Sequence, residues 1–180
     1  MKKLFPLTLI AAAFLAGCST TPLPEDGGAP VESRSAGSDV KPVVAGDLDA
    51  SGLPRELTDP KSPLSQRSIY FDLDQFDVKA QYQGLVNNHA KYLTANRGYK
   101  VLIQGNTDER GSREYNLSLG QKRADAVKRS LVLLGVPESQ IESVSLGEEK
   151  PKNPGQGDAA WAENRRADIL YRAPDGRGEF

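Results

Sequence analysis

The side chains best suited to chemistry are concentrated in one short polar turn at residues 105–111. Between its two glycines the turn carries an amide, a hydroxyl, two acids and a guanidinium: Asn106, Thr107, Asp108, Glu109 and Arg110. It directly follows an apolar run at 99–103 that predicts a strand. A rigid scaffold holds the ends of such a loop while its tip meets solvent, so loops of this kind commonly carry binding groups. The turn is therefore the first candidate for a binding site.

Support for enzymatic chemistry is weaker. The only cysteine, Cys18, lies far upstream of the turn, and the only histidine, His89, falls on the apolar face of a predicted helix. We expect His89 to be a hydrogen-bonded core residue. Acids are numerous enough to supply a pair of catalytic carboxylates, but none lies in an evidently apolar setting that would raise its pKa. No enzymatic motif is found.

Metal and phosphate motifs fail on their spacing. The acidic run at 72–77 faintly suggests calcium, but its sixth position is Asp77 instead of glycine and its twelfth is Gln83 instead of glutamate. The turn at 105–111 separates its glycines by five residues and lacks the Lys-Ser/Thr of a phosphate loop. No metal and no cofactor is expected.

Residues 1–17 have the pattern of an export signal. Lys2 and Lys3 precede an apolar run at 4–16 that is too short to span a bilayer, which takes about 20 apolar residues. The run ends in Leu-Ala-Gly-Cys, a lipobox that predicts cleavage before Cys18 and acylation of its sulfur and amine. Several acyl chains make a stable membrane anchor. Ser19 resembles the outer-membrane default of bacterial lipoproteins.

Residues 18–67 are predicted to be a lipidated N-terminus and disordered tether. From residue 19 to residue 68 the chain holds seven prolines and no aromatic residue, too little apolar surface to offset the entropy of ordering. A weak amphipathic patch at 53–57 is expected to form a single turn at most. Removal of Lys2 and Lys3 with the leader changes the net charge from −1 to −3, which argues against a nucleic-acid partner.

The remaining region, 68–172, is long enough for one domain with a modest core. Hydrophobic patterns predict strands at 68–71, 100–104, 141–146 and 167–171, two main helices and a short helix at 159–163. The first main helix is expected to start at an Asp77 cap and to bury Val78, Tyr82, Leu85, Tyr92 and Leu93. The second is expected to start at a Ser112 cap and to bury Leu117, Ala124, Val127, Leu131 and Leu134. The order βαβαββ predicts an α+β fold with a mixed sheet covered on one face by two helices, and 173–180 is predicted to fray.

Five segments of this region resemble, in order, the OmpA-like peptidoglycan-binding domains. They are IYFDLDQFD at 69–77, HAKYL at 89–93, the segment 105–124, GEEKP at 147–151 and NRRA at 164–167. The resemblance covers essentially all of 68–172 and implies the family's βαβαββ sandwich. It does not extend to the tether or to the chain beyond residue 171.

The resemblance implies a ligand and a set of contacts. The ligand is the peptide stem of peptidoglycan, held through diaminopimelate, whose end carries an ammonium and a carboxylate on one carbon. Asp108 matches the family's ammonium-binding acid and Arg123 its carboxylate-binding arginine, while Asp108 capping its turn or Arg123 pairing with Asp125 or Glu114 stay open as structural alternatives. Further implied contacts are Leu73, Asp74, Thr107, Asn116 and Leu119. Of Arg165 and Arg166, one is expected to brace a loop and the other to face the ligand.

The implied role is a non-catalytic tether between the outer membrane and the cell wall. In this role, acylated Cys18 anchors the chain in the outer membrane, and the domain lies in the periplasm. The implied protein partner is the Tol system, whose propeller TolB is expected to cover the same face, in support of envelope integrity and cell division. A lipoprotein enzyme that remodels the wall through acids near the same cleft is the alternative.

Overall fold

The computed structural model describes residues 48–180. The predicted leader, Cys18 and the tether up to residue 47 lie outside the described residues. Within 48–180, no helix combines the length and the apolar character needed to cross a membrane.

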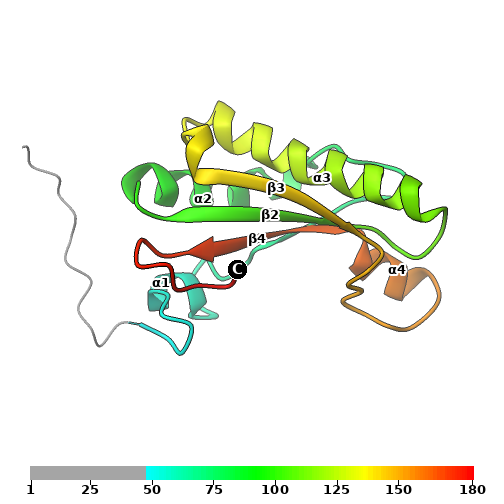
Figure 1. Cartoon of the computed structure of the whole chain (residues 1–180), viewed down its shortest axis with the longest axis horizontal. Helices are drawn as coiled ribbons and strands as arrows, with labels where there is room; N and C mark the ends of the chain where they lie inside the picture. The colour runs from blue at the N-terminus through cyan, green and yellow to red at the C-terminus, as the bar shows by residue number, and fades with distance from the viewer. Residues whose placement is uncertain (1–47) are drawn as a thin grey trace, which may run out of the picture. The chain divides into compact units, whose positions relative to one another are not determined.

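Four strands form one mixed sheet: β1 (Ser68–Tyr70), β2 (Lys100–Asn106), β3 (Ile141–Gly147) and β4 (Arg166–Arg172). Their order across the sheet is β1-β4-β2-β3 (Figure 1). β2 and β3 are parallel, whereas β4 runs antiparallel to both β1 and β2. Buried and less buried side chains alternate along β4, as expected when one face of a sheet meets the core. The predicted α+β class and mixed sheet are confirmed.

Two helices, α2 (Gln83–Ala95) and α3 (Arg113–Leu133), cover one face of this sheet, while α1 (Arg55–Thr58) and the short α4 (Asp158–Asn164) lie on the other side (Figure 1). The predicted N-cap of α3 is confirmed, because the Ser112 hydroxyl accepts the Tyr115 N–H at 3.2 Å. Gly135 follows α3 with a φ of +93°, a backbone conformation that glycine adopts without a side-chain clash. The two short 3₁₀ turns are η1 (Ala80–Tyr82) and η2 (Glu138–Gln140).

The helix boundaries and one apolar stripe differ from the prediction. α2 begins at Gln83 after η1, and Asp77 does not cap it: the segment after β1 turns at 72–75 and is held there by tertiary contacts described below. On α3, Ala124, Val127 and Leu131 are fully buried, but Leu117 is 52% exposed, because the inward face of the helix runs through Leu119 and Arg123 instead. Leu134, 44% exposed, already lies beyond the last turn.

The prediction of a disordered tether is wrong for residues 48–67. Leu53 and Leu57 have no exposed surface and belong to the same core as β1 and β4. The turn around them is closed by a bridge between Leu48 and Pro54 and by Arg67, whose guanidinium donates to the Leu57 carbonyl. Burial of these leucines in the domain core, together with those contacts, orders a segment whose composition alone predicts disorder.

The C-terminal residues also pack instead of fraying. β1 pairs only with residues 166–168 of β4, which leaves the second half of β4 with an open edge on that side. The tail turns back along that edge: the Glu179 N–H donates to the Tyr171 carbonyl at 2.9 Å and the Ala173 N–H to the Arg177 carbonyl at 2.7 Å. Unpaired strand edges carry unsatisfied backbone groups, and the tail satisfies them here.

Candidate ligand-binding site

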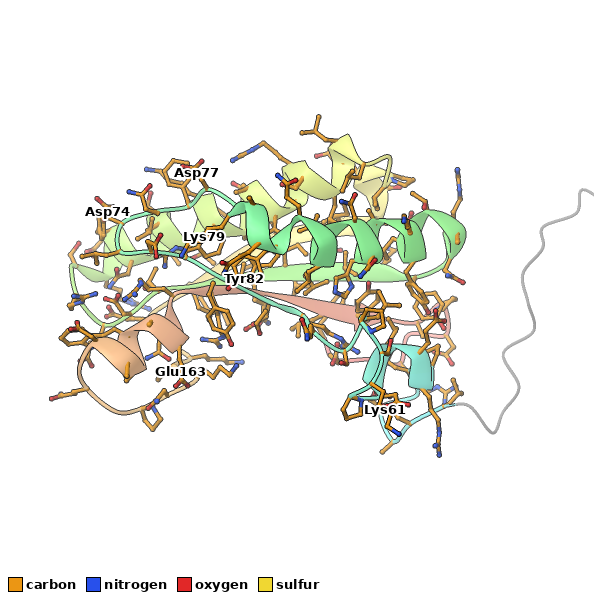
Figure 2. The ribbon with its side chains drawn as sticks, turned by 180° about the vertical axis from the view of Figure 1, so that it is seen from behind. Lys61, Asp74, Asp77, Lys79, Tyr82 and Glu163 are labelled. Carbon is orange, nitrogen blue, oxygen red and sulfur yellow. The ribbon has the colours of Figure 1, made fainter. Side chains whose placement is uncertain are left out.

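All seven predicted contact residues line one small cavity. Two come from the loop after β1, two from the turn after β2 and three from the first half of α3: Leu73, Asp74, Thr107, Asp108, Asn116, Leu119 and Arg123. Three further residues complete the lining: Arg110 and Tyr115, which are not among the predicted contacts, and Arg165, one of the two arginines of which one was expected to face the ligand. Figure 2 shows Asp74 at the same end of the sheet as α4, which carries Glu163, and far from Lys61 in the N-terminal segment.

A close contact between two glycines brings α3 against the end of β2. A Cβ atom built on Gly105 would lie 1.8 Å from the Gly120 carbonyl oxygen, so no other residue fits there without moving the helix. This approach sets the turn 105–111 directly beside the first half of α3. The polar turn and the helix therefore share one cavity.

Arg123 supports the cavity from within the protein. It has no exposed surface, and its guanidinium donates to the carbonyls of Gln75 and Asn106, both at 2.9 Å, and of Asp72 at 3.2 Å. It thereby joins the loop after β1 to the end of β2. Burial, together with the charge of Arg165, lowers the pKa of Arg123 to about 10, so it remains a cation at neutral pH.

The structural alternative for Arg123, an ion pair along its own helix, is wrong for Asp125. The Asp125 carboxylate instead accepts from Gln121 at 2.9 Å and from the Ser143 hydroxyl at 2.7 Å. Arg123 uses carbonyl partners on two other segments, which is why it points into the domain instead of along the helix surface.

Asp108 is a buried carboxylate surrounded by donors. It is 4% exposed, and its Oδ1 accepts the Arg110 main-chain N–H at 3.2 Å and Arg110 Nε at 3.0 Å. Its Oδ2 accepts Arg110 Nη2 at 2.9 Å and Arg165 Nη1 at 3.2 Å. Burial alone would raise the pKa of Asp108, but the hydrogen bonds from Arg110 and Arg165 lower it below its usual value. Asp108 therefore stays ionised near neutral pH and is unsuited to act as a general acid.

Two further polar features belong to the cavity lining. The Thr107 hydroxyl is buried and has no hydrogen-bond partner, an arrangement that costs free energy unless a ligand or water supplies one. Asp74 has a φ of +56°, unusual for a residue other than glycine, and its carboxylate accepts from the Tyr115 hydroxyl. That hydrogen bond raises the pKa of Tyr115.

The structure places the two adjacent arginines in different environments. Arg165 lines the cavity, pairs with Asp108 and donates to the Phe71 carbonyl at 3.1 Å. Arg166 points elsewhere, pairing with Asp168 at 2.8 Å and donating to the Asn164 carbonyl at 3.5 Å. Successive residues at the start of a strand point to opposite sides, so the two neighbours enter different environments.

His89 is confirmed as a core residue. It has no exposed surface, and its ring nitrogens lie 2.8 Å from the Tyr171 hydroxyl and 2.8 Å from the Gln66 carbonyl oxygen. Arg110 and Tyr115, which line the cavity without being among the predicted contacts, lie in the polar turn and in the first turn of α3. Their proximity in sequence to Asp108 was the signal available.

A four-stranded mixed sheet with a charged cavity at the end of β2 defines a small ligand-binding domain, and comparison with known proteins gives its family. The profile of the OmpA family matches residues 70–165, which include every residue lining the cavity. The chain is 39% identical to the peptidoglycan-associated lipoprotein of Pseudomonas putida, over 92% of this chain and 94% of that protein. It is 38% identical to the Legionella pneumophila protein of the same name, over 93% of each.

Solved structures agree with this relationship. The crystal structure of the peptidoglycan-associated lipoprotein from Burkholderia pseudomallei matches with a TM-score of 0.64 and 58% identity, over 65% of this chain and 99% of that one. The C-terminal domain of Helicobacter pylori MotB shares the fold, with a TM-score of 0.56 at 19% identity, over 60% of this chain and 85% of that one. The chain therefore belongs to the OmpA family, within its group of peptidoglycan-associated lipoproteins.

Proposed function

We propose that this protein binds peptidoglycan non-covalently through the diaminopimelate of its stem peptide and thereby tethers the outer membrane to the cell wall. Family membership and the names of the relatives support a wall ligand. The observation that carries the proposal is the convergence of seven expected contacts, from three separate segments, on one cavity.

The charges of the cavity suit a zwitterion. Its lining contains two carboxylates, Asp74 and Asp108, and three guanidinium groups, Arg110, Arg123 and Arg165. The side-chain end of diaminopimelate carries an ammonium and a carboxylate on one carbon, so its binding site needs an anion and a cation a few ångströms apart. Charge-assisted hydrogen bonds of both signs would then fix its orientation. The buried Thr107 hydroxyl offers one further hydrogen bond.

The anchor and the protein partner belong to the same proposal. Acylated Cys18 would hold the chain in the outer membrane, and the segment from there to residue 47 would separate the domain from the lipid surface. TolB of the Tol system would cover the face that contains Asp74, Asp108 and Arg123, so TolB and the wall would compete. Titrating TolB into protein preloaded with a stem peptide tests this: a stable ternary complex with unchanged affinities would show separate sites.

The central experiment is co-sedimentation of the chain from residue 19 onward with isolated sacculi. We expect the protein to pellet with the sacculi and free diaminopimelate-containing stem peptide to release it. Release of soluble muropeptides during the incubation would instead favour the enzymatic alternative. Protein that stays in the supernatant at every concentration would contradict wall binding.

A further inference from the structure

Asp108 has no acceptor position left for a ligand. An ionised carboxylate offers about four lone-pair sites, and Asp108 already accepts four N–H groups, three from Arg110 and one from Arg165. The cavity beside it measures about 20 Å³. A cavity needs about 10–15 Å³ to hold a single water. The end of an amino acid therefore needs more room than this cavity offers.

Of the two arginines on Asp108, Arg110 is the more exposed, and within residues 48–180 it donates hydrogen bonds to no residue other than Asp108. The Arg165 side chain is 13% exposed and is also held by the Phe71 carbonyl. The Arg110 side chain is 35% exposed, and beyond Asp108 its guanidinium has an aromatic neighbour, lying 4.1 Å from the ring centroid of Trp161. Trp161 is itself fixed by a hydrogen bond from its indole N–H to Glu109 at 3.1 Å.

We infer that Arg110 is a specificity-determining residue whose guanidinium occupies the cation position on Asp108 and must be exchanged for the ammonium of an incoming ligand. The inference rests on the proposed function. A ligand that brings only an ammonium must displace Arg110 without compensation. A ligand with an ammonium and a carboxylate on one carbon gives Asp108 a new cation and gives the released guanidinium a new anion. Arg110 thereby favours zwitterionic ends over purely cationic ones, and Trp161 is a positioning residue that holds Arg110 over the site.

The size of the effect follows from the population of the displaced state. Minor conformations of this kind are populated to about 0.1–10%, and apparent affinity falls by that fraction. Removing Arg110 is therefore expected to raise the affinity for a cationic end about tenfold or more. For a zwitterionic end the same gain is offset by the lost contact between Arg110 and the ligand carboxylate.

Two stem peptides test the inference. One contains diaminopimelate, whose side chain ends in an ammonium and a carboxylate, and the other carries lysine at the same position. Calorimetric titration of the chain from residue 19 onward should show a strong preference for the diaminopimelate peptide. In Arg110→Gln, the lysine peptide should bind about tenfold tighter and the diaminopimelate peptide within about threefold of the original, so the preference shrinks about tenfold. The matched control is Arg113→Gln, which removes a nearby arginine that is 77% exposed and pairs with Glu149; it should change neither affinity.

Fluorescence supplies a second measurement, because Trp161 is the only tryptophan. Binding of the diaminopimelate peptide should shift Trp161 emission in the original protein and leave it nearly unchanged in Arg110→Gln. If Arg110→Gln does not fold, Arg110→Lys replaces it: an ammonium lacks the planar fork that gives Asp108 two parallel N–H bonds, so the preference should fall by an intermediate factor.

The outcomes separate the two proposals. The inference is overturned if the original protein binds the diaminopimelate peptide but the Arg110 variants bind the lysine peptide with unchanged or lower affinity. The proposed function would then still stand. Failure of the diaminopimelate peptide to bind both the original protein and the variants overturns the proposed function, and the inference with it.

Discussion

Asp108 and Arg123 line the same cavity, yet each is held by its own set of partners. Asp108 is hydrogen-bonded by Arg110 and Arg165, whereas Arg123 donates to three main-chain carbonyls. The protein thereby keeps an anion and a cation near one another without letting them neutralise each other directly. The arrangement assigns different structural tasks to the two residues.

Arg123→Ala should lower both stability and wall binding. The substitution leaves three carbonyls without their donor and opens a cavity, so we expect the free energy of unfolding to fall by about 3 kcal/mol. Sacculus binding should fall roughly ten- to a hundred-fold. Urea denaturation followed by circular dichroism measures the first effect and co-sedimentation the second. Arg113→Ala, at an exposed position, should change stability by no more than about 0.5 kcal/mol, and equal losses in the two variants would contradict the bracing role of Arg123.

Asp108→Asn should weaken wall binding roughly ten- to a hundred-fold while preserving the shape of the side chain. Because the folded-state pKa of Asp108 is lowered, its carboxylate stabilises the protein above its unfolded pKa of about 3.9, and this contribution disappears as pH falls through the folded pKa. The variant should therefore lose less stability on acidification than the original. Calorimetric binding at neutral pH and denaturation at several acidic pH values test both statements. Unaltered binding would mean that Asp108 only orders its own turn.

Protonation of His89 should make a second acid-sensitive contribution to the free energy of unfolding, at higher pH than that of Asp108. Burial lowers its pKa to about 4 from an unfolded value of about 6.5, so the unfolded chain binds the proton first as pH falls. Stability should decline between pH about 6.5 and pH about 4, by about 3 kcal/mol in total. His89→Gln, which keeps hydrogen-bonding capacity, should flatten the stability curve over this range while lowering stability at neutral pH. A curve with the same slope in both proteins would assign the acid sensitivity to other groups.

Glu179 couples the two ends of the described chain. Its carboxylate accepts from Arg67, which also donates to the Leu57 carbonyl, and from the Tyr171 N–H at 2.8 Å. Glu179→Ala should lower the free energy of unfolding by about 1–2 kcal/mol and speed amide hydrogen exchange around Leu57. Asp175→Ala, which removes an exposed pair with Arg177 in the same tail, is the control and should have an effect within about 0.5 kcal/mol. Slow exchange at Leu57 in the Glu179 variant would show that the N-terminal segment docks without the tail.

Cys18→Ala should prevent lipidation and leave the unprocessed precursor, because the thiol that accepts the lipid is missing. Metabolic labelling with a radioactive fatty acid, followed by fractionation of the membranes, measures this directly. Ser19→Ala changes the neighbouring residue and should keep the label. Label retained in the Cys18 variant would contradict the predicted anchor.

Much of the domain follows from local sequence patterns. The apolar runs locate β2, β3 and β4, the Ser112 hydroxyl marks the start of α3, and the position of His89 on an apolar helical face assigns it to the core. These features depend on the period of side chains along a strand or helix and on capping by a neighbouring residue. The resemblance to a family then selected the seven residues that the fold gathers around the cavity.

Tertiary structure decided the rest, because it depends on contacts between segments far apart in sequence. The open edge of β4 orders the tail, and the apolar surface beside it orders Leu53 and Leu57, although their own composition favours disorder. Long-range hydrogen bonds from Arg123 hold the loop after β1, and α2 begins only at Gln83. The difference between Arg165 and Arg166 has the same origin: identical neighbouring side chains leave a strand in opposite directions, and only the fold determines which one meets Asp108.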